Sequence, residues 1–108
     1  MAKFSLNPPA TFKAKVFIPL AGSAPAEVLC EFKYRNRTEL DVFRDGLAKM
    51  TDTEAVEAVL VGWDLVEEFS AENIERLVVT YPGAGFAILN EYTRQLFGAV
   101  GARSLTGG

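Results

Sequence analysis

Apolar and polar side chains alternate with a period of two over residues 11–35, in two runs joined by a turn at residues 19–25. Alternation of this kind is typical of half-buried strands, and a turn rich in proline and glycine between two such runs indicates a hairpin. The apolar positions are Phe12, Ala14, Val16 and Ile18 in the first run, and Ala26, Val28, Cys30, Phe32 and Tyr34 in the second. We expect an antiparallel β-hairpin, with the lysines of the first strand opposite the glutamates of the second.

After residue 35 the apolar spacing changes to i, i+3, i+4, which is typical of helices that bury one face. Serine and threonine residues that precede these segments have the pattern of helix caps. The first expected helix is Glu39–Met50, after a cap at Thr38, and the second is a short helix after a cap at Thr51, with an apolar stripe from Val56 to Trp63. The third runs from a cap at Ser70 to the residue before Pro82, and the last runs from about Pro82 to Phe97 or Gly98.

These elements predict an α+β fold, with an N-terminal antiparallel β-hairpin followed by a bundle of about four short helices. The length of 108 residues suits one domain with a modest core. We expect a single α+β domain over residues 1–100, in which an extended lead-in at 1–10 and the hairpin at 11–35 precede a helical part at 38–100. Residues 101–108 are small and polar without periodicity, which predicts a flexible tail.

Charge is distributed unevenly along the chain. Residues 1–37 hold six basic and two acidic residues, a balance of +4, whereas residues 38–79 hold three basic and eleven acidic residues, a balance of -8. The isoelectric point near 4.9 argues against a nucleic-acid partner, which would require a basic footprint. Opposite charges on two regions favour protein partners or head-to-tail self-association. No apolar run approaches the roughly 18 residues that a membrane span requires.

The sequence offers no set of residues for catalysis. It contains no histidine, which is the commonest metal ligand and proton carrier near neutral pH. Its one cysteine, Cys30, falls on the apolar face of a predicted strand without a base beside it, and it has no partner for an intramolecular disulfide. The acidic residues between Asp64 and Glu72 lack the glycine and the spacing of a calcium loop. We therefore expect no enzyme, no cofactor and no metal site, in a protein of the reducing cytoplasm.

The last predicted helix has apolar residues on two flanks. One stripe consists of Ile88, Leu89, Tyr92, Leu96 and Val100. Phe86 and Phe97 are three turns apart on a different flank, with Thr93 between them, and a hairpin with three short helices can cover only part of such a helix. Trp63, at the expected end of the second helix, either fills the core or anchors a partner. The candidate partner-binding residues are therefore Trp63, Phe86, Thr93 and Phe97.

An ordered series of short segments resembles the tail assembly chaperones of long-tailed phages and prophages. The segments are Met1-Ala2-Lys3-Phe4, Asn7-Pro8, Thr11-Phe12-Lys13-Ala14-Lys15-Val16, Phe32-Lys33-Tyr34-Arg35, Val61-Gly62-Trp63-Asp64-Leu65, Phe69-Ser70-Ala71-Glu72-Asn73 and Tyr81-Pro82-Gly83-Ala84. The resemblance covers nearly the whole chain, and none of its segments is a catalytic signature.

The resemblance implies a chaperone that works in the host cell cytoplasm and is not expected in the mature virion. Its partners would be the long, helical tape measure protein, which it escorts, and the major tail protein, which it helps to recruit. Modest apolar contacts of the helix-in-groove kind would suit such a client. Two alternatives remain open on the residues: a small structural component of a phage tail or secretion-like apparatus, and a non-catalytic subunit or regulatory domain of an enzyme complex.

Overall fold

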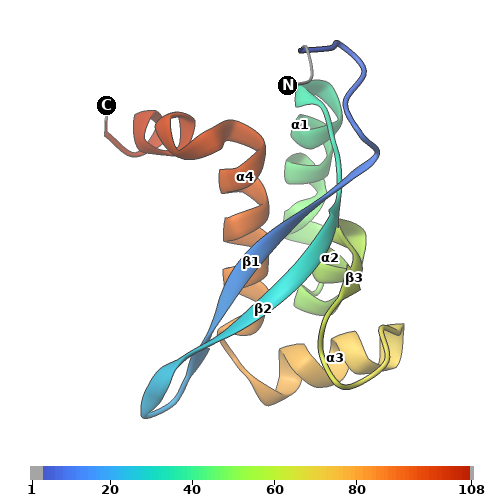
Figure 1. Cartoon of the computed structure of the whole chain (residues 1–108), viewed down its shortest axis with the longest axis vertical. Helices are drawn as coiled ribbons and strands as arrows, with labels where there is room; N and C mark the ends of the chain where they lie inside the picture. The colour runs from blue at the N-terminus through green and yellow to red at the C-terminus, as the bar shows by residue number, and fades with distance from the viewer. Residues whose placement is uncertain (1–3, 108) are drawn as a thin grey trace.

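A twisted sheet and a layer of helices make up the fold, with the helices packed on one face of the sheet (Figure 1). The computed structural model of the protein describes residues 4–107, and the side chains of residues 4–98. The elements are β1 (Thr11–Leu20), β2 (Ser23–Lys33), α1 (Arg37–Gly46), a 3-10 helix η1 (Leu47–Lys49), α2 (Asp52–Val59), β3 (Leu60–Trp63), α3 (Ala71–Thr80) and α4 (Ala84–Gly107). The predicted α+β class, a hairpin followed by helices, is confirmed.

Strands β1 and β2 form the expected hairpin. Their pairing is antiparallel, and it places Lys13 opposite Glu31. On the same outer face, the Lys15 ammonium lies 3.4 Å from the Glu27 carboxylate in an exposed ion pair. The other face carries the alternating apolar residues, which are buried from Ala14 onward in β1. The period-two pattern therefore places the core face correctly, because successive side chains of a strand point to opposite sides.

The apolar stripe expected at the end of the second helix is instead a third strand. Helix α2 ends at Val59, and Leu60 takes an extended conformation with φ -95° and ψ 143°. Strand β3 then pairs antiparallel with β2, with Leu60 opposite Phe32 and Trp63 opposite Cys30. The prediction of one helical stripe through Trp63 was wrong because a four-residue strand and a helical turn have similar apolar spacing. Pairing with β2 favours the strand, because it gives hydrogen-bond partners to backbone N–H and C=O groups along the edge of β2 that a longer helix would leave unpaired.

The first helix begins earlier than the capping pattern at Thr38 indicates. Asn36 is the cap: its side chain accepts a hydrogen bond from the Glu39 backbone N–H at 2.9 Å. In return, the Glu39 carboxylate accepts one from the Asn36 backbone N–H at 2.9 Å. This reciprocal arrangement needs a glutamate or glutamine three residues after the cap, which Asn36 has and Thr38 lacks. The caps predicted at Thr51 and Ser70 are confirmed.

Replacing Asn36 by alanine is expected to destabilise the protein by about 1 kcal/mol, because the first turn of α1 loses its side-chain acceptor. The matched control is Thr38→Ala, which removes a hydroxyl of the same first turn and should change the free energy of unfolding much less. Urea denaturation of both variants measures the difference. A loss for Asn36→Ala no larger than that for Thr38→Ala would contradict the expected contribution of the cap.

Four aromatic rings form the centre of the core between sheet and helices. Tyr92 of α4 is fully buried and stacks on Phe32 at 5.5 Å and on Phe12 at 6.1 Å between ring centroids. The Phe43 ring of α1 meets Tyr92 edge-on at 6.2 Å. The Tyr92 hydroxyl donates to the Lys33 carbonyl oxygen at 2.8 Å and accepts from the Arg35 guanidinium at 3.1 Å. One side chain therefore joins α4, both strands of the hairpin and α1.

Helix α4 changes direction at Gly98. Gly98 has φ 80°, a left-handed conformation that favours glycine. This position agrees with the expected end of the last helix at Phe97 or Gly98, although helical backbone resumes and continues to Gly107. The flexible tail expected at residues 101–108 stays a prediction, and Gly108 lies outside the described residues. Within residues 4–107, no helix has both the length and the apolar composition of a membrane span.

Candidate functional site: an apolar groove beside helix α3

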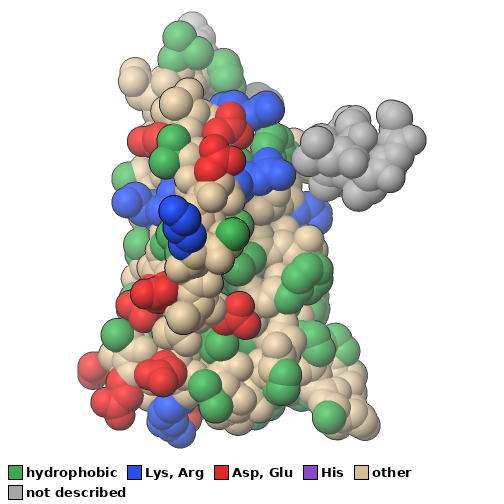
Figure 2. Space-filling view, turned by 180° about the vertical axis from the view of Figure 1, so that it is seen from behind, with side chains coloured by type: hydrophobic (Ala, Val, Ile, Leu, Met, Phe, Trp, Pro, Cys, Tyr) green, Lys and Arg blue, Asp and Glu red, His purple; other side chains and the backbone are tan. Residues whose placement is uncertain are grey.

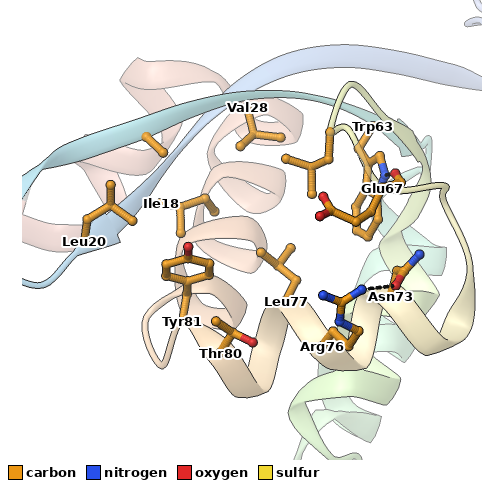
Figure 3. A pocket seen from close by; sticks show the side chains of 12 residues that line it. Ile18, Leu20, Val28, Trp63, Glu67, Asn73, Arg76, Leu77, Thr80 and Tyr81 are labelled. Carbon is orange, nitrogen blue, oxygen red and sulfur yellow. Dashed lines mark hydrogen bonds between the residues drawn. The ribbon is translucent and has the colours of Figure 1, made fainter.

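A groove of about 320 Å³ opens between the turn end of the hairpin, the loop that follows β3, and helix α3. Figure 3 shows residues of α3 on one wall and the hairpin residues Ile18 and Val28 on the opposite wall. The lining residues are Ile18, Leu20, Ala26, Val28, Trp63, Leu65, Glu67, Asn73, Arg76, Leu77, Thr80 and Tyr81. Most of these side chains are apolar, and the charged ones stand at the α3 and loop side.

The groove exists because α3 packs mainly on α2 and α4 and not on the sheet. Ile74 is the buried residue that fixes α3 to the core. Leu77 and Tyr81, one and two turns further on, follow the same helical stripe but extend past the covered area towards the hairpin (Figure 3). Leu77 is therefore only partly buried, and Tyr81 keeps 40% of its surface exposed. The stripe was expected to face the core. Ile74, Leu77 and Val78 do pack there, while Leu77 and Tyr81 also line the groove.

Trp63 forms one end of the groove. Its indole N–H donates a hydrogen bond to the Glu67 backbone carbonyl oxygen at 2.9 Å. Phe69 meets the indole ring edge-on, with ring centroids 5.2 Å apart. These two contacts hold the ring in place while part of it stays open to the groove. The sequence left open whether Trp63 fills the core or meets a partner, and in the structure it packs against the core and also lines the groove.

Asp64 fixes the loop that leaves β3. Its carboxylate accepts a hydrogen bond from the Leu29 backbone N–H at 3.0 Å, and its own backbone N–H donates to the Leu29 carbonyl oxygen at 3.1 Å. This pair of bonds extends the β2–β3 pairing by one residue beyond Trp63. The loop that carries Leu65 and Glu67 therefore starts from a rigid point at the groove.

The α3 side of the groove is acidic. Between residues 64 and 81 the chain has one basic residue, Arg76, against the five acidic residues Asp64, Glu67, Glu68, Glu72 and Glu75. Figure 2, which views the helical side of the molecule, shows acidic side chains gathered at the end where α3 lies. Arg76 donates a hydrogen bond to the Asn73 side chain at 3.1 Å. The surroundings of the apolar groove therefore favour a ligand that carries positive charge.

The other candidate residues lie on α4, and none of them lines the groove. Phe86 is 76% exposed. Thr93 is partly buried, and its hydroxyl donates to the Leu89 carbonyl oxygen of the same helix at 3.1 Å. Phe97 is also partly buried, with the guanidinium groups of Arg37 and Arg44 over its ring at 5.5 and 5.7 Å. Phe86 and Phe97 thus differ in environment, and α1 covers the second.

Cys30 is a buried core residue, as expected. It is 1% exposed, and burial raises the pKa of its thiol to about 12, with a smaller contribution from the negative charge of Asp64. A thiol with such a pKa is almost entirely protonated near neutral pH, so it is a poor nucleophile there. Among the described residues, no group of three or more His, Cys, Asp or Glu side chains has the arrangement of a metal site.

Sequence reasoning identified Trp63 but not the rest of the groove. Leu77 and Tyr81 have the helical spacing of core-facing residues, and Leu65 is a single apolar residue in a loop. The sequence pattern therefore cannot distinguish these groove residues from core residues. One signal in the sequence was the end of the α3 stripe. It ends in Tyr81, beside Pro82, and a tyrosine at such a position is often half-exposed.

These features define a small α+β protein with an open apolar groove at one end and an acidic loop and helix beside it. A family model described as "Phage tail assembly chaperone" matches residues 1–101, so the chain belongs to this family. The resemblance read from the sequence is therefore confirmed. Neither the curated proteins nor the solved structures contain a significant match to the chain.

Proposed function

We propose that this chain binds a helical segment of the tape measure protein in the apolar groove and helps to recruit major tail subunits while the tail is assembled. The observation that carries the proposal is the groove itself, in a member of a tail assembly chaperone family. An assembly chaperone needs an accessible surface that holds a client without changing it chemically. The groove between α3 and the hairpin is such a surface, and we propose that the protein acts without catalysis.

The chemistry of the groove specifies the segment that it would bind. Ile18 and Val28 form the apolar hairpin wall of the groove, and Leu77 and Tyr81 form the opposite apolar wall. An amphipathic helix would place two or three apolar side chains, spaced i, i+3, i+4, against these surfaces. The acidic loop and α3 favour lysine or arginine at the margins of that helix. Burial of part of one helix face yields modest affinity, which suits a contact that must later be released.

Release from the tail is part of the proposal. We propose that the protein acts in the cytoplasm of the host cell and is absent from mature virions. Mass spectrometry of purified tails tests this part, because a chaperone should leave no stoichiometric signal. A signal in proportion to the tail subunits would instead favour the alternative of a retained structural component.

Replacing Tyr81 by aspartate is expected to abolish co-purification of the chain with the tape measure protein. Tyr81 lines the groove and is 40% exposed, so the substitution places a negative charge on the groove wall with little loss of core packing. The measurement is co-expression of the two proteins, followed by affinity purification and quantification of soluble tape measure protein. We expect the recovered client to fall about tenfold or more, since an apolar contact of this size contributes about 1.5–3 kcal/mol.

Val79→Asp is the matched control for this experiment. Val79 is two residues from Tyr81 in the same helix, is 71% exposed and does not line the groove. It should therefore leave client binding unchanged. A second comparison uses Phe86→Asp, at the exposed position on α4 expected from the sequence to bind a partner. If Phe86→Asp removes binding while Tyr81→Asp does not, the client surface is on α4 and the groove is not the site.

A further inference from the structure

The N-terminal segment carries two large apolar side chains that the described part of the chain leaves uncovered. Phe4 is 93% exposed and Leu6 is 88% exposed. Asn7, Pro8 and Pro9 follow, and the segment joins the sheet at Ala10, whose carbonyl oxygen accepts a hydrogen bond from the Tyr34 backbone N–H at 2.9 Å. Exposed apolar side chains of this size, two positions apart, mark a contact surface when they recur in one short segment.

The groove and this segment are complementary in chemistry. The chain bends at Leu6 and Asn7 in the structure. If the segment binds in an extended conformation, Phe4 and Leu6 point to the same side, because side chains alternate along a strand. Two adjacent apolar side chains suit an apolar groove of about 320 Å³. Lys3 precedes them in the sequence, and the loop and helix beside the groove are acidic at Glu67 and its neighbours. The lining of the groove holds one acidic residue, Glu67, and one basic residue, Arg76, whereas the loop and helix around it are acidic. The segment is therefore apolar and basic, and the groove is apolar with acidic surroundings.

In the structure this segment lies outside the groove of its own chain, and it cannot reach the part of that groove at the hairpin turn. Strand β1 begins at Thr11, and its far end supplies Ile18 and Leu20 to the groove. Ile18 is seven residues along the strand, about 23 Å from Thr11. Leu6 is five residues before Thr11 and reaches at most about 18 Å from it. The N-terminal segment and α3 accordingly lie at opposite ends of the molecule (Figure 1).

We propose that the groove of one copy receives Phe4–Leu6 of a second copy, so that copies of this chain associate head to tail. The donor segment and the receiving groove are different surfaces at opposite ends, so each added copy offers a free segment and a free groove. Such a contact produces open chains and not a closed dimer, unless the copies happen to form a ring. The charge asymmetry along the sequence, basic at the start and acidic in the middle, has the sign that this contact requires.

The contact would also regulate the groove. This part rests on the proposed function, because a client helix in the groove and the segment of a second copy exclude each other. A client segment then displaces Phe4 and Leu6 and dissociates the chains. Copies without a client keep their apolar grooves covered, which limits non-specific association of an exposed apolar surface.

Sedimentation velocity over a range of protein concentrations tests the contact. The wild-type chain should show a sedimentation coefficient that rises with concentration and falls when salt is added, since the start of the chain is basic and the loop and helix around the groove are acidic. A double variant, Phe4→Ser with Leu6→Ser, should remain monomeric, with association weakened about 100-fold. Both residues are exposed, so circular dichroism should show an unchanged fold. The control Val42→Ser removes an apolar side chain that is 69% exposed on α1 and should associate as the wild type does.

Complementary variants provide the sharpest test. Tyr81→Asp keeps the N-terminal segment and loses the groove, whereas the double variant keeps the groove and loses the segment. Each alone should be monomeric, and an equimolar mixture should form dimers and nothing larger. A wild-type chain that stays monomeric, or a mixture that does not pair, overturns the proposal.

A tape measure segment added to the wild-type chain separates this proposal from the proposed function. Binding with dissociation of the chains supports both. Binding to a chain that was monomeric throughout overturns the head-to-tail contact and leaves the proposed function intact. Failure to bind a chain that does self-associate overturns the proposed function and leaves the contact intact.

Discussion

Replacing Tyr92 by alanine is expected to lower the free energy of unfolding by about 3–5 kcal/mol, a large part of the stability of a small domain. The Tyr92 side chain is fully buried and contacts the rings of Phe12, Phe32 and Phe43. Removing it leaves a cavity at the junction of α4, the hairpin and α1, which three aromatic rings cannot fill without moving. Urea denaturation followed by circular dichroism measures the change.

Tyr92→Phe separates the packing of this residue from its hydrogen bonds. The variant keeps the ring but leaves the Lys33 carbonyl oxygen without its donor and the Arg35 guanidinium without its acceptor. A loss of about 1–2 kcal/mol is expected, since these groups are only partly exposed to water. If Tyr92→Phe costs as much as Tyr92→Ala, the hydroxyl and not the ring stack holds these elements together.

The Cys30 thiol is expected to react with a disulfide reagent about 1000-fold more slowly in the folded protein than in the unfolded chain at pH 8. Burial raises its pKa from 9.0 to about 12, and each unit lowers the thiolate fraction about tenfold in this range. Steric protection adds to this effect, because the side chain is 1% exposed. The measurement is the rate of labelling in native buffer and in concentrated urea. Equal rates in the two conditions would place Cys30 at an accessible position.

The same pKa shift makes stability depend on pH in the alkaline range. Below pH 9 the Cys30 thiol is protonated in both states, so its contribution to stability is complete. Between pH 9 and about 12 the unfolded chain loses this proton and the folded protein keeps it, so the folded state loses stability as the pH rises. The matched variant Cys30→Ala lacks this titration. The difference in unfolding free energy between wild type and variant should therefore change over this window, whereas a constant difference would contradict the shift.

The two walls of the groove differ in how firmly they belong to the core. Its hairpin wall is a direct continuation of the core, since Ile18 and Val28 belong to the buried face of the sheet. Its other wall is α3, which has only Ile74 fully inside the core. Substitutions on the hairpin wall would therefore disturb folding and binding together, whereas Tyr81 is a position where binding is changed with little effect on folding.

The sequence by itself determined the local elements and the type of protein. The alternation from Phe12 to Tyr34 is sufficient for a hairpin with a defined buried face, because the period of a strand permits only one assignment of sides. The stripe from Ile88 to Leu96 similarly determined the buried face of α4. The ordered segments indicated the family that the family model confirms.

Only the tertiary structure decided how those elements share their surfaces. Residues Leu60–Trp63 become a strand because the edge of β2 is available to them, and a sequence pattern of four residues contains no information about that edge. The cap of α1 is different: it is Asn36 for a local reason, because Glu39 follows three residues later, and this signal was already present in the sequence. The groove arises because α3 packs on α2 and α4 and passes beside the sheet, so that Tyr81 lines an opening and Leu77 lies between that opening and the core. An apolar stripe predicts that one face of a helix is covered. The packing of the other elements decides whether the same chain or a partner covers that face.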